Sequence, residues 1–307
     1  MNIKYIFRKE YRKCIKRRII QILFRYIPDI LYIKVIYRIK LKKRLNIKNP
    51  STFNEKIQWI KIHDRNPIYT TLADKFLVRN YVKERIGNEY LIPLFGVYSN
   101  YSEIDFDSLP NQFVIKPNHT SGDIIICKDK SILDYNYLEA LSKLWLKNNH
   151  YWMGRDWAYN HIKPKILCEH YLQDSCENEL KDYKLLCFHG KVKCSFVCSN
   201  RFSTKTLNVD FYDLDWHLMP FERHFPKSNT LIPKPYTYNR MIELAEILTE
   251  GIPFARIDFY EVDQRVFFGE ITLYPGSGLE KFTPETYDAL LGSWIQLPVT
   301  SVQHQKS

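Results

Sequence analysis

Two carboxylates near the C-terminal end of the chain, Asp258 and Glu270, have the types and spacing of a metal site. Arg256 shares a strand face with Asp258, and Thr272 shares one with Glu270, because side chains alternate with a period of two along a strand. If the two segments pair as a hairpin, the two acids can meet across it. Two adjacent carboxylates repel each other, and a hard divalent cation such as Mg2+ resolves that repulsion through its oxygen ligands.

The two segments that would carry these residues are apolar. Residues 255–260 and 266–272 both read as strands, with Asp263 and Gln264 as the turn between them. A solvated charge network does not require hydrophobic neighbours such as Phe259 and Phe268, so the setting favours the metal interpretation. The alternative is an exposed face on which an arginine simply pairs with one acid.

Lys116 is the second candidate, at the end of a strand predicted over 113–116. The turn that follows, residues 117–122, is rich in hydrogen-bond donors and includes His119 and Ser121. A lysine beside a turn of backbone donors can cradle a phosphate, although most isolated strand-end lysines are simply solvated. His119 is a candidate for binding a phosphate or an acceptor carboxylate, with stabilisation of the turn as the alternative.

The third candidate is the end of a strand predicted from Ile166, before a polar break at residues 173–180. Backbone groups left free at such a strand end can hydrogen-bond a purine edge while apolar neighbours cover its two faces. The residues concerned are Glu169, His170, Tyr171 and Leu172.

The remaining pattern mixes helices with antiparallel strands, which predicts an α+β fold rather than strict strand-helix alternation. Thr52 and Glu55 form a capping box that should begin a helix. Further helices are predicted over 73–86, closed by Gly87, and over 133–147 and 241–249. Extended segments are predicted over 90–98 and 124–127, with a strand pair over 184–199 that turns at His189 and Gly190.

The net charge of +11 is concentrated at the N-terminus. Residues 1–50 contain 16 lysines and arginines and two acidic residues, whereas the remainder contains 29 basic and 32 acidic residues. From Ile15 to Ile27 a helical projection places aliphatic residues on one side and Arg17, Arg18 and Arg25 largely opposite. Such a helix either lies on an anionic bilayer or packs on the protein with a solvated basic face. Nucleic acid is not the expected partner, because aliphatic residues interrupt the cations.

Membrane spanning and secretion are not expected. No run of eighteen apolar residues exists, and the first thirty residues are too charged for a signal peptide. The seven cysteines are odd in number and scattered, so they are expected to be reduced core residues. We therefore expect a cytoplasmic protein, peripheral on the inner face of the membrane if the N-terminal helix binds lipid.

The order of these pieces resembles the ATP-grasp superfamily, and more narrowly its TupA-like branch from bacterial surface-polysaccharide loci. The resemblance covers roughly residues 49–290. It is carried by Asp74-Lys75, Val114-Ile115-Lys116-Pro117-Asn118, Cys168-Glu169-His170-Tyr171-Leu172, Asp182-Tyr183-Lys184, Arg256-Ile257-Asp258-Phe259 and Gly269-Glu270-Ile271-Thr272-Leu273-Tyr274-Pro275-Gly276.

The resemblance implies two α/β lobes that hold ATP between antiparallel sheets, with Mg2+ as the metal. The implied regions are 1–48 (basic helical segment), 49–110 (helical or substrate region), 111–175 (first lobe), 176–290 (second lobe with the metal site) and 291–307 (C-terminal tail).

The resemblance also implies residue roles. Lys75, on a helix, and Lys116, on a strand, would bind phosphates together with Ser121, and Glu169 to Leu172 would hold adenine. Asp182 or Lys184 would contact the sugar or phosphates. Asp258 and Glu270 would hold magnesium, and Arg256 would stabilise the transferred phosphoryl group. Thr272 stands where the superfamily generally has Asn, so we expect a weaker or water-mediated contact with a second metal there. His119, Arg201 and Ser277 are candidate substrate contacts.

The implied reaction is ATP-dependent formation of an amide through an acyl phosphate. By analogy with the branch, the carboxylate belongs to a uronic acid of a capsule, teichuronic acid or O-antigen glycan or of a sugar nucleotide, and the amine to an amino compound. The main rival is a metal-dependent glycosyltransferase, because Asp213 and Asp215 form an Asp-x-Asp pattern beside Trp216. A non-catalytic scaffold held at the membrane by residues 1–48 is a third alternative.

Overall fold

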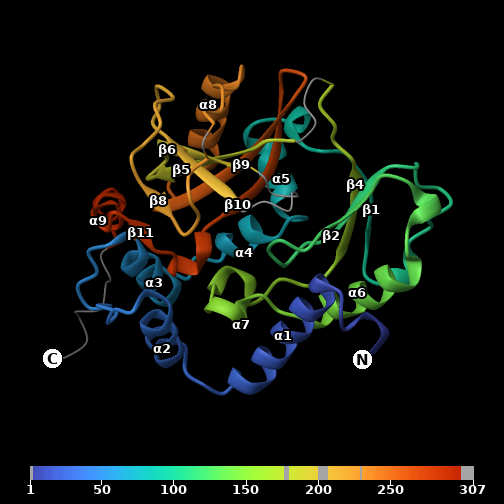
Figure 1. Ribbon diagram of the computed structural model, residues 1–307, viewed down its shortest axis with the longest axis horizontal. Coiled ribbons are helices and arrows are strands. Elements are labelled where there is room, and N and C mark those ends of the chain that lie inside the picture. The colour runs from blue at the N-terminus through green and yellow to red at the C-terminus, as the bar shows by residue number, and fades with distance from the viewer. Residues whose placement is uncertain (1–2, 176–179, 200–206, 229, 299–307) are drawn as a thin grey trace.

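The computed structural model describes residues 3–175, 180–199, 207–228 and 230–298. Within them lie two antiparallel sheets, which Figure 1 shows on opposite sides of the molecule. The first sheet has the order β1-β4-β2-β3 and the second β10-β9-β5-β6-β7. A short pair, β8 and β11, joins Glu222–Arg223 to Phe282–Thr283.

The strands of the first sheet are β1 (Leu94–Tyr98), β2 (Phe113–Pro117), β3 (Ile125–Cys127) and β4 (Ile166–His170). The strands of the second sheet are β5 (Asp182–Phe188), β6 (Lys191–Ser199), β7 (Asn208–Tyr212), β9 (Phe254–Val262) and β10 (Arg265–Thr272). Both tight turns expected in the second sheet are present. His189 and Gly190, like Asp263 and Gln264, have the positive φ angles that two-residue hairpins require.

The α-helices are α1 (Lys9–Phe24), α2 (Asp29–Leu41), α3 (Phe53–His63), α4 (Ile68–Ala73), α5 (Val78–Arg85), α6 (Tyr135–Lys147), α7 (Tyr151–Gly154), α8 (Tyr238–Leu248) and α9 (Thr286–Ser293). Short 3-10 turns occupy Ile3–Tyr5, Asn88–Tyr90, Tyr101–Glu103, Lys130–Ile132, Trp157–Tyr159 and Pro275–Gly278. The predicted capping box is confirmed at the start of α3.

Each sheet has its own hydrophobic core. The second sheet packs with α3, α4 and α8 around buried residues such as Ile257 and Leu244. The first sheet packs with α6 and with the inner side of α1 around residues such as Ile115 and Trp145. The first sheet also begins earlier than the implied lobe boundary at 111, since β1 comes from the region expected to be helical or substrate-binding.

The helix predicted over 73–86 is confirmed only from Val78 to Arg85, and its predicted start is wrong. The Asp74 carboxylate accepts hydrogen bonds from the backbone N–H groups of Phe76 at 2.8 Å and Leu77 at 3.2 Å, so the chain turns there before α5 begins. Lys75 therefore lies in a turn and not on a helix. Gly87 does follow α5, but its φ of 116° lies outside the left-handed helical region that was expected.

The N-terminal helix packs on the body in a different orientation from the one expected. Its buried residues are Tyr11, Cys14 and Arg17. Arg17 was predicted on the solvated face, whereas Ile19 and Leu23, expected on the apolar contact face, are 50% and 65% exposed. The helix turns this way because buried Asp123 attracts Arg17 into the protein.

The six described cysteines are free thiols, five of them buried, which confirms their expected role in the core. In the part of the chain that the structure covers, no helix combines the length and apolar character needed to cross a bilayer.

Candidate active site

The charged face of the second sheet carries six polar side chains from three neighbouring strands. They are Asp182, Lys184, Arg256, Asp258, Glu270 and Thr272. Asp258 lies directly opposite Glu270 across the β9–β10 pair, and Lys184 lies opposite Asp258 across the β5–β9 pair. The opposite face carries Ile257 and Phe259, which are fully buried in the core. The predicted meeting of the two carboxylates is confirmed.

A β-bulge makes this meeting possible. The β9–β10 register shifts between Phe268 and Glu270, so Phe268 pairs with Phe259 in the core while Glu270 pairs with Asp258 on the charged face. Gly269 occupies the bulge, where an added Cβ atom would lie 3.0 Å from the carbonyl oxygen of Asp258. A glycine within a strand is a recognised signal for a bulge, and it is the one signal from which the sequence could have indicated this feature.

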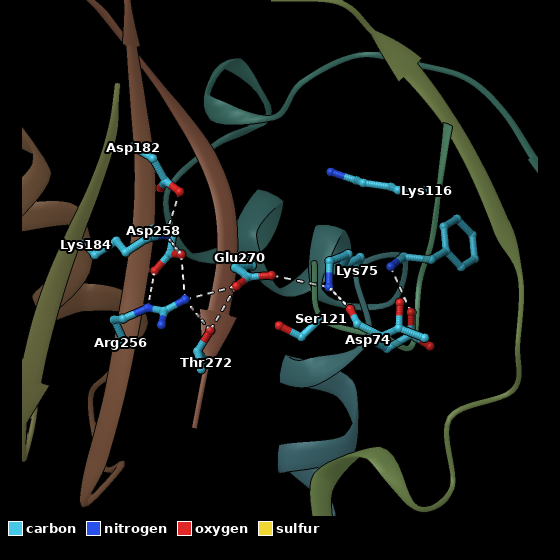
Figure 2. Close-up of polar contacts among 12 residues, drawn as sticks. Asp74, Lys75, Lys116, Ser121, Asp182, Lys184, Arg256, Asp258, Glu270 and Thr272 are labelled. Atoms are coloured by element: carbon cyan, nitrogen blue, oxygen red, sulfur yellow. Dashed lines mark hydrogen bonds and ion pairs between the residues drawn. The ribbon is translucent and has the colours of Figure 1, made fainter. Parts of the chain in front are cut away.

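Arg256 joins the two carboxylates. Its Nε donates to Asp258 Oδ1 at 2.6 Å and its Nη2 donates to Asp258 Oδ2 at 2.7 Å. The same Nη2 donates to Glu270 Oε1 at 3.0 Å and to the hydroxyl of Thr272 at 2.9 Å, and Figure 2 shows the guanidinium between the two acids. Lys184 donates to Asp258 and, at 2.6 Å, to Asp182.

These contacts set the protonation of the site. Burial raises the pKa of Glu270, but the charges of Lys75, Arg256 and Lys184 outweigh burial and hold that pKa well below its usual range. Burial also raises the pKa of Asp258, against the opposing effect of Arg256 and Lys184. Burial alone would lower the pKa of Arg256, but its contacts with Asp258 raise it. Glu270 is therefore ionised and Arg256 charged at neutral pH.

Lys75 connects the charged face to the first sheet. Its Nζ lies 3.2 Å from Glu270 Oε2 and donates to the carbonyl of Thr120 at 2.7 Å. Its backbone N–H donates to the carbonyl of Asn118 at 3.0 Å. Thr120 and Asn118 belong to the loop between β2 and β3, so Lys75 holds that loop beside Glu270 (Figure 2).

The loop between β2 and β3 contains the other expected phosphate contacts. Ser121 is exposed at its tip. Helix α1 holds the loop from the opposite side, since Arg17 pairs with Asp123 and donates to the carbonyl of Ser121 at 2.9 Å. Lys13 adds a hydrogen bond of 2.8 Å to the carbonyl of Gly122. Sequence reasoning missed this role of α1, because nothing in the local pattern links residues 106 positions apart.

Lys116 extends from β2 toward the space between the sheets (Figure 2). Its Nζ lies 2.5 Å from Glu169 Oε1 on β4, and Glu169 is nearly buried. Strand β4 ends at His170, so Tyr171 and Leu172 are not part of the strand predicted to continue to 172.

A cavity of about 370 Å³ opens beside this strand end. Its wall includes the three expected adenine contacts that follow Glu169, together with apolar residues from the segment before β1 and from β10. These lining residues include His170, Tyr171, Leu172, Leu91, Pro93 and Phe267. Phe267 pairs with Tyr260 on β9, two residues from Asp258, so one strand pair leads from the cavity to the carboxylates. Sequence reasoning did not select Leu91 or Phe267.

The expected substrate residues lie apart from one another. His119 is 2% exposed, and its ring nitrogens contact Asn118 Oδ1 and the Trp145 carbonyl, both at 2.9 Å. This arrangement favours the turn-stabilising alternative. The Ser277 hydroxyl donates to Asp156 Oδ2 at 2.7 Å, just beyond the end of β10. Arg201 lies outside the described residues.

The Asp-x-Asp pattern lies beyond β7, at the edge of the second sheet farthest from β10. The Asp213 carboxylate accepts hydrogen bonds from the backbone N–H groups of Asp215 at 3.0 Å and His217 at 2.8 Å. Asp213 thus stabilises its own turn, which accounts for its presence without a metal.

The donors on the charged face fit a hard divalent cation that also takes ligands from a phosphate. Among the described residues no group of three or more His, Cys, Asp or Glu side chains is arranged as a metal site. Asp258 and Glu270 nevertheless supply paired carboxylates, which is the usual protein share of a phosphate-bound Mg2+. Both carboxylates contact Arg256 here, so a cation between them would displace part of the guanidinium contact.

Known proteins were compared with the chain. The model of the TupA-like ATP-grasp family matches residues 55–296. A search of curated proteins found no match. Similar solved structures include D-alanine–D-alanine ligase from Helicobacter pylori, with 15% identity, a TM-score of 0.46 and coverage of 81% of this chain and 68% of that chain.

The chain spans only about half the length of two further solved structures to which it is similar. The chain matches D-alanine–D-alanine ligase from Bacillus anthracis in complex with ATP at 12% identity and a TM-score of 0.40, over 66% of this chain and 54% of that one. It matches L-amino acid ligase from Bacillus licheniformis at 12% identity and a TM-score of 0.38, over 68% of this chain and 42% of that one. The family match covers most of the chain and agrees with the expected α+β architecture of two antiparallel sheets. The chain therefore belongs to the TupA-like ATP-grasp family.

Proposed function

We propose that this protein is an ATP-dependent carboxylate–amine ligase of bacterial surface-polysaccharide biosynthesis. Members of the ATP-grasp family are ATP-dependent ligases, and the present chain keeps the charges that such a reaction uses. The observation that carries the proposal is the Lys75 bridge, which joins the loop between β2 and β3 to Glu270 on the opposite sheet. The residues proposed to bind phosphate would thus share one site with the two carboxylates.

The proposed reaction activates a carboxylate that is otherwise a poor electrophile. ATP would donate its γ-phosphoryl group to the carboxylate, which would leave ADP and an acyl phosphate, and Mg2+ would neutralise the phosphate charge. An amine would then displace phosphate from the acyl phosphate to give an amide. Phosphoryl transfer depends mainly on positioning and electrostatic stabilisation. Lys75 and Lys116 would hold the phosphates with Ser121, Asp258 and Glu270 would hold the cation, and Arg256 would stabilise the transferred group.

The nucleotide base is assigned to the cavity beside the end of β4. Apolar side chains such as Leu91 and Phe267 would cover its faces, while the backbone at Tyr171 and Leu172 would bind its edge. Asp182 and Lys184 lie on the charged face beside Asp258, where they would contact the sugar or phosphates.

Thr272 is proposed to act mainly through its neighbours and only weakly on a metal. Its hydroxyl accepts from Arg256 at 2.9 Å and donates to Glu270 Oε1 at 3.1 Å. Because this hydroxyl both accepts and donates a hydrogen bond, it orients the guanidinium of Arg256 and the carboxylate of Glu270. This fits the expectation that a residue other than Asn at this position holds a second cation weakly or through water.

The proposed substrates are a uronic acid, in a glycan or a sugar nucleotide, and an amino compound. This assignment is supported by the resemblance to the TupA-like branch. Ser277 is the substrate candidate nearest to the end of β10, in a turn where Gly276, Ser277 and Gly278 all have positive φ. His119 and Arg201 complete the candidate set, and the proposed location is the cytoplasm.

The test is ADP release with ATP and Mg2+ over a matrix of uronic acids and amino compounds. We expect release that requires one member of each class, with an amide as the product. Lys116→Ala and Asp258→Asn should abolish it, because each deletes charge opposite the phosphates. A matched control, Asp213→Asn, removes a carboxylate just beyond the far edge of the same sheet and should leave ADP release unchanged. Near-normal release by both site variants would contradict the site assignment.

Two further assays separate the rival functions. Consumption of a UDP-sugar without ATP, lost in Asp213→Asn, would establish the glycosyltransferase instead. A scaffold would be indicated if Glu270→Gln left polymer modification intact in cells while deletion of residues 1–48 abolished it.

A further inference from the structure

The outer surface of α1 and α2 is both apolar and basic. Seven large hydrophobic side chains between residues 19 and 39 are at least half exposed. They are Ile19, Ile22, Leu23, Tyr26, Leu31, Val35 and Ile39. Figure 1 shows α1 and α2 together along the lower edge of the molecule. We call these seven residues and the cations beside them the N-terminal surface.

The side chains of α2 follow three rows set by the helical period. The row that faces the body contains the buried residues Ile33, Tyr37 and Leu41. Leu31, Val35 and Ile39, spaced by four, form an exposed apolar row. Lys34 and Arg38 form an exposed basic row beside it, and Lys42 is exposed just beyond the end of the helix.

Helix α1 has the same kind of outer side. Lys16 is exposed one turn before Ile19 and two turns before Leu23, and Arg25 is exposed just beyond the end of the helix. Its inner cations are already used, since Arg17 pairs with Asp123 and Arg18 donates to the carbonyl of Lys147 at 2.7 Å. The cations available to a partner are therefore those next to the apolar residues.

Negative charge is nearly absent from this surface. The one acidic residue between 11 and 50, Asp29, lies 2.9 Å from Arg65 and accepts a hydrogen bond from Tyr151 at 2.5 Å. None of the ion pairs formed by the described residues uses Lys16, Lys34 or Arg38. The acids near these rows are already paired, Asp29 with Arg65 and Glu285 with Lys43, so the apolar and basic rows complement an interface with acyl chains below anionic phosphates.

We propose that α1 and α2 dock this protein on an anionic lipid bilayer. The aliphatic side chains enter the boundary of the acyl chains, and the neighbouring lysines and arginines contact lipid phosphates. Another copy of the chain or a soluble polyanion would use only one of the two properties. The packing of α1 on the body therefore does not compete with lipid binding, because the two contacts use opposite sides of the helix.

The test is flotation of the full chain with vesicles of phosphatidylcholine alone or with 30 mol% phosphatidylglycerol added. We expect binding to the anionic vesicles that falls steeply between 0.1 and 0.5 M salt, because Debye screening shortens to a few ångströms. A lysine near such a surface contributes about fivefold in partitioning, so K34Q/R38Q should reduce binding by more than about tenfold. Leu23→Ser combined with Val35→Ser should reduce it as well.

Matched controls alter residues of the same types elsewhere. Ile132→Ser removes an aliphatic side chain that is 81% exposed, and K83Q/K281Q removes two exposed cations. These controls should bind like the wild type, and all variants should keep its melting temperature because each side chain is exposed. Equal binding to neutral vesicles, no binding at all, or self-association that depends on Leu23 and Val35 in sedimentation would each overturn the proposal.

Discussion

The charge of Glu270 should stabilise the folded protein as well as serve the proposed reaction. Glu270→Gln keeps the shape of the side chain but removes the charge that faces Lys75 at 3.2 Å and Arg256 at 3.0 Å. Hydrogen bonds to charged groups contribute about 1.5–3 kcal/mol each to the free energy of unfolding, and hydrogen bonds to neutral acceptors contribute about half as much. With the side chain 26% exposed, we expect a loss of about 2–3 kcal/mol in the free energy of unfolding, or roughly 4–10 °C in Tm.

A double-mutant cycle identifies the origin of that loss. Lys75→Met alone should also destabilise, but Lys75→Met combined with Glu270→Gln should cost less than the sum, because no unpaired charge remains. We expect a coupling energy of about 1–2 kcal/mol from denaturant unfolding. Effects that add within about 0.5 kcal/mol would refute the idea that the Lys75–Glu270 bridge contributes to stability.

The pH dependence gives a second readout of the same prediction. The folded pKa of Glu270 lies below the value of 4.5 for an unperturbed glutamate, so its stabilisation is present above that pH and is lost as the pH falls through the folded pKa. The stability difference between the wild type and Glu270→Gln should therefore be constant from pH 7 to about 5 and shrink below about pH 4. A difference that stays unchanged down to pH 3 would show that charge is not its cause.

Three further outcomes are expected. Asp123→Asn leaves Arg17 buried without its carboxylate, so the free energy of unfolding should fall by about 3 kcal/mol in denaturant melts, and R17M/D123N should recover at least half of it. Gly269→Val places a side chain 3.0 Å or less from the Asp258 carbonyl and should cost about 1–3 kcal/mol; unchanged nucleotide affinity by calorimetry in the folded variant would show that the bulge does not position the site. Burial lowers the pKa of His119 to about 4, so its NMR resonances should not titrate between pH 8 and 5.5. The free energy of unfolding should fall as the pH falls from 6.5 toward 4, because the unfolded chain then takes up a proton that buried His119 does not.

Several elements were predictable because their signals are local. The capping box at Thr52 depends on residues three positions apart, and the turns at His189-Gly190 and Asp263-Gln264 depend on adjacent residues. The alternation of polar and apolar residues in β9 placed Arg256 and Asp258 on one face. Local side-chain chemistry also explains the error at Lys75, since the turn held by the carboxylate of Asp74 makes α5 begin at Val78, five residues later than the apolar pattern suggested.

The facing of α1 could not be predicted from its own residues. A helical projection assigns the apolar side inward by default, but here the buried partner is a carboxylate, Asp123, more than a hundred positions away. An arginine that pairs with a buried acid turns inward and leaves aliphatic side chains such as Leu23 in solvent. Only contacts between distant segments decide such a choice.

The sequence by itself determined which residue types were present for the proposed reaction, their order along the chain, and the strands that carry Asp258 and Glu270. It did not determine that these two acids would be direct partners, because a regular hairpin from the Asp263-Gln264 turn would pair Glu270 with Ile257. The bulge at Gly269 shifts the register by one residue, and the register of a sheet is set by the packing of its whole buried face. The same reason applies to Lys75, which reaches Glu270 only because two separate cores hold the two sheets together.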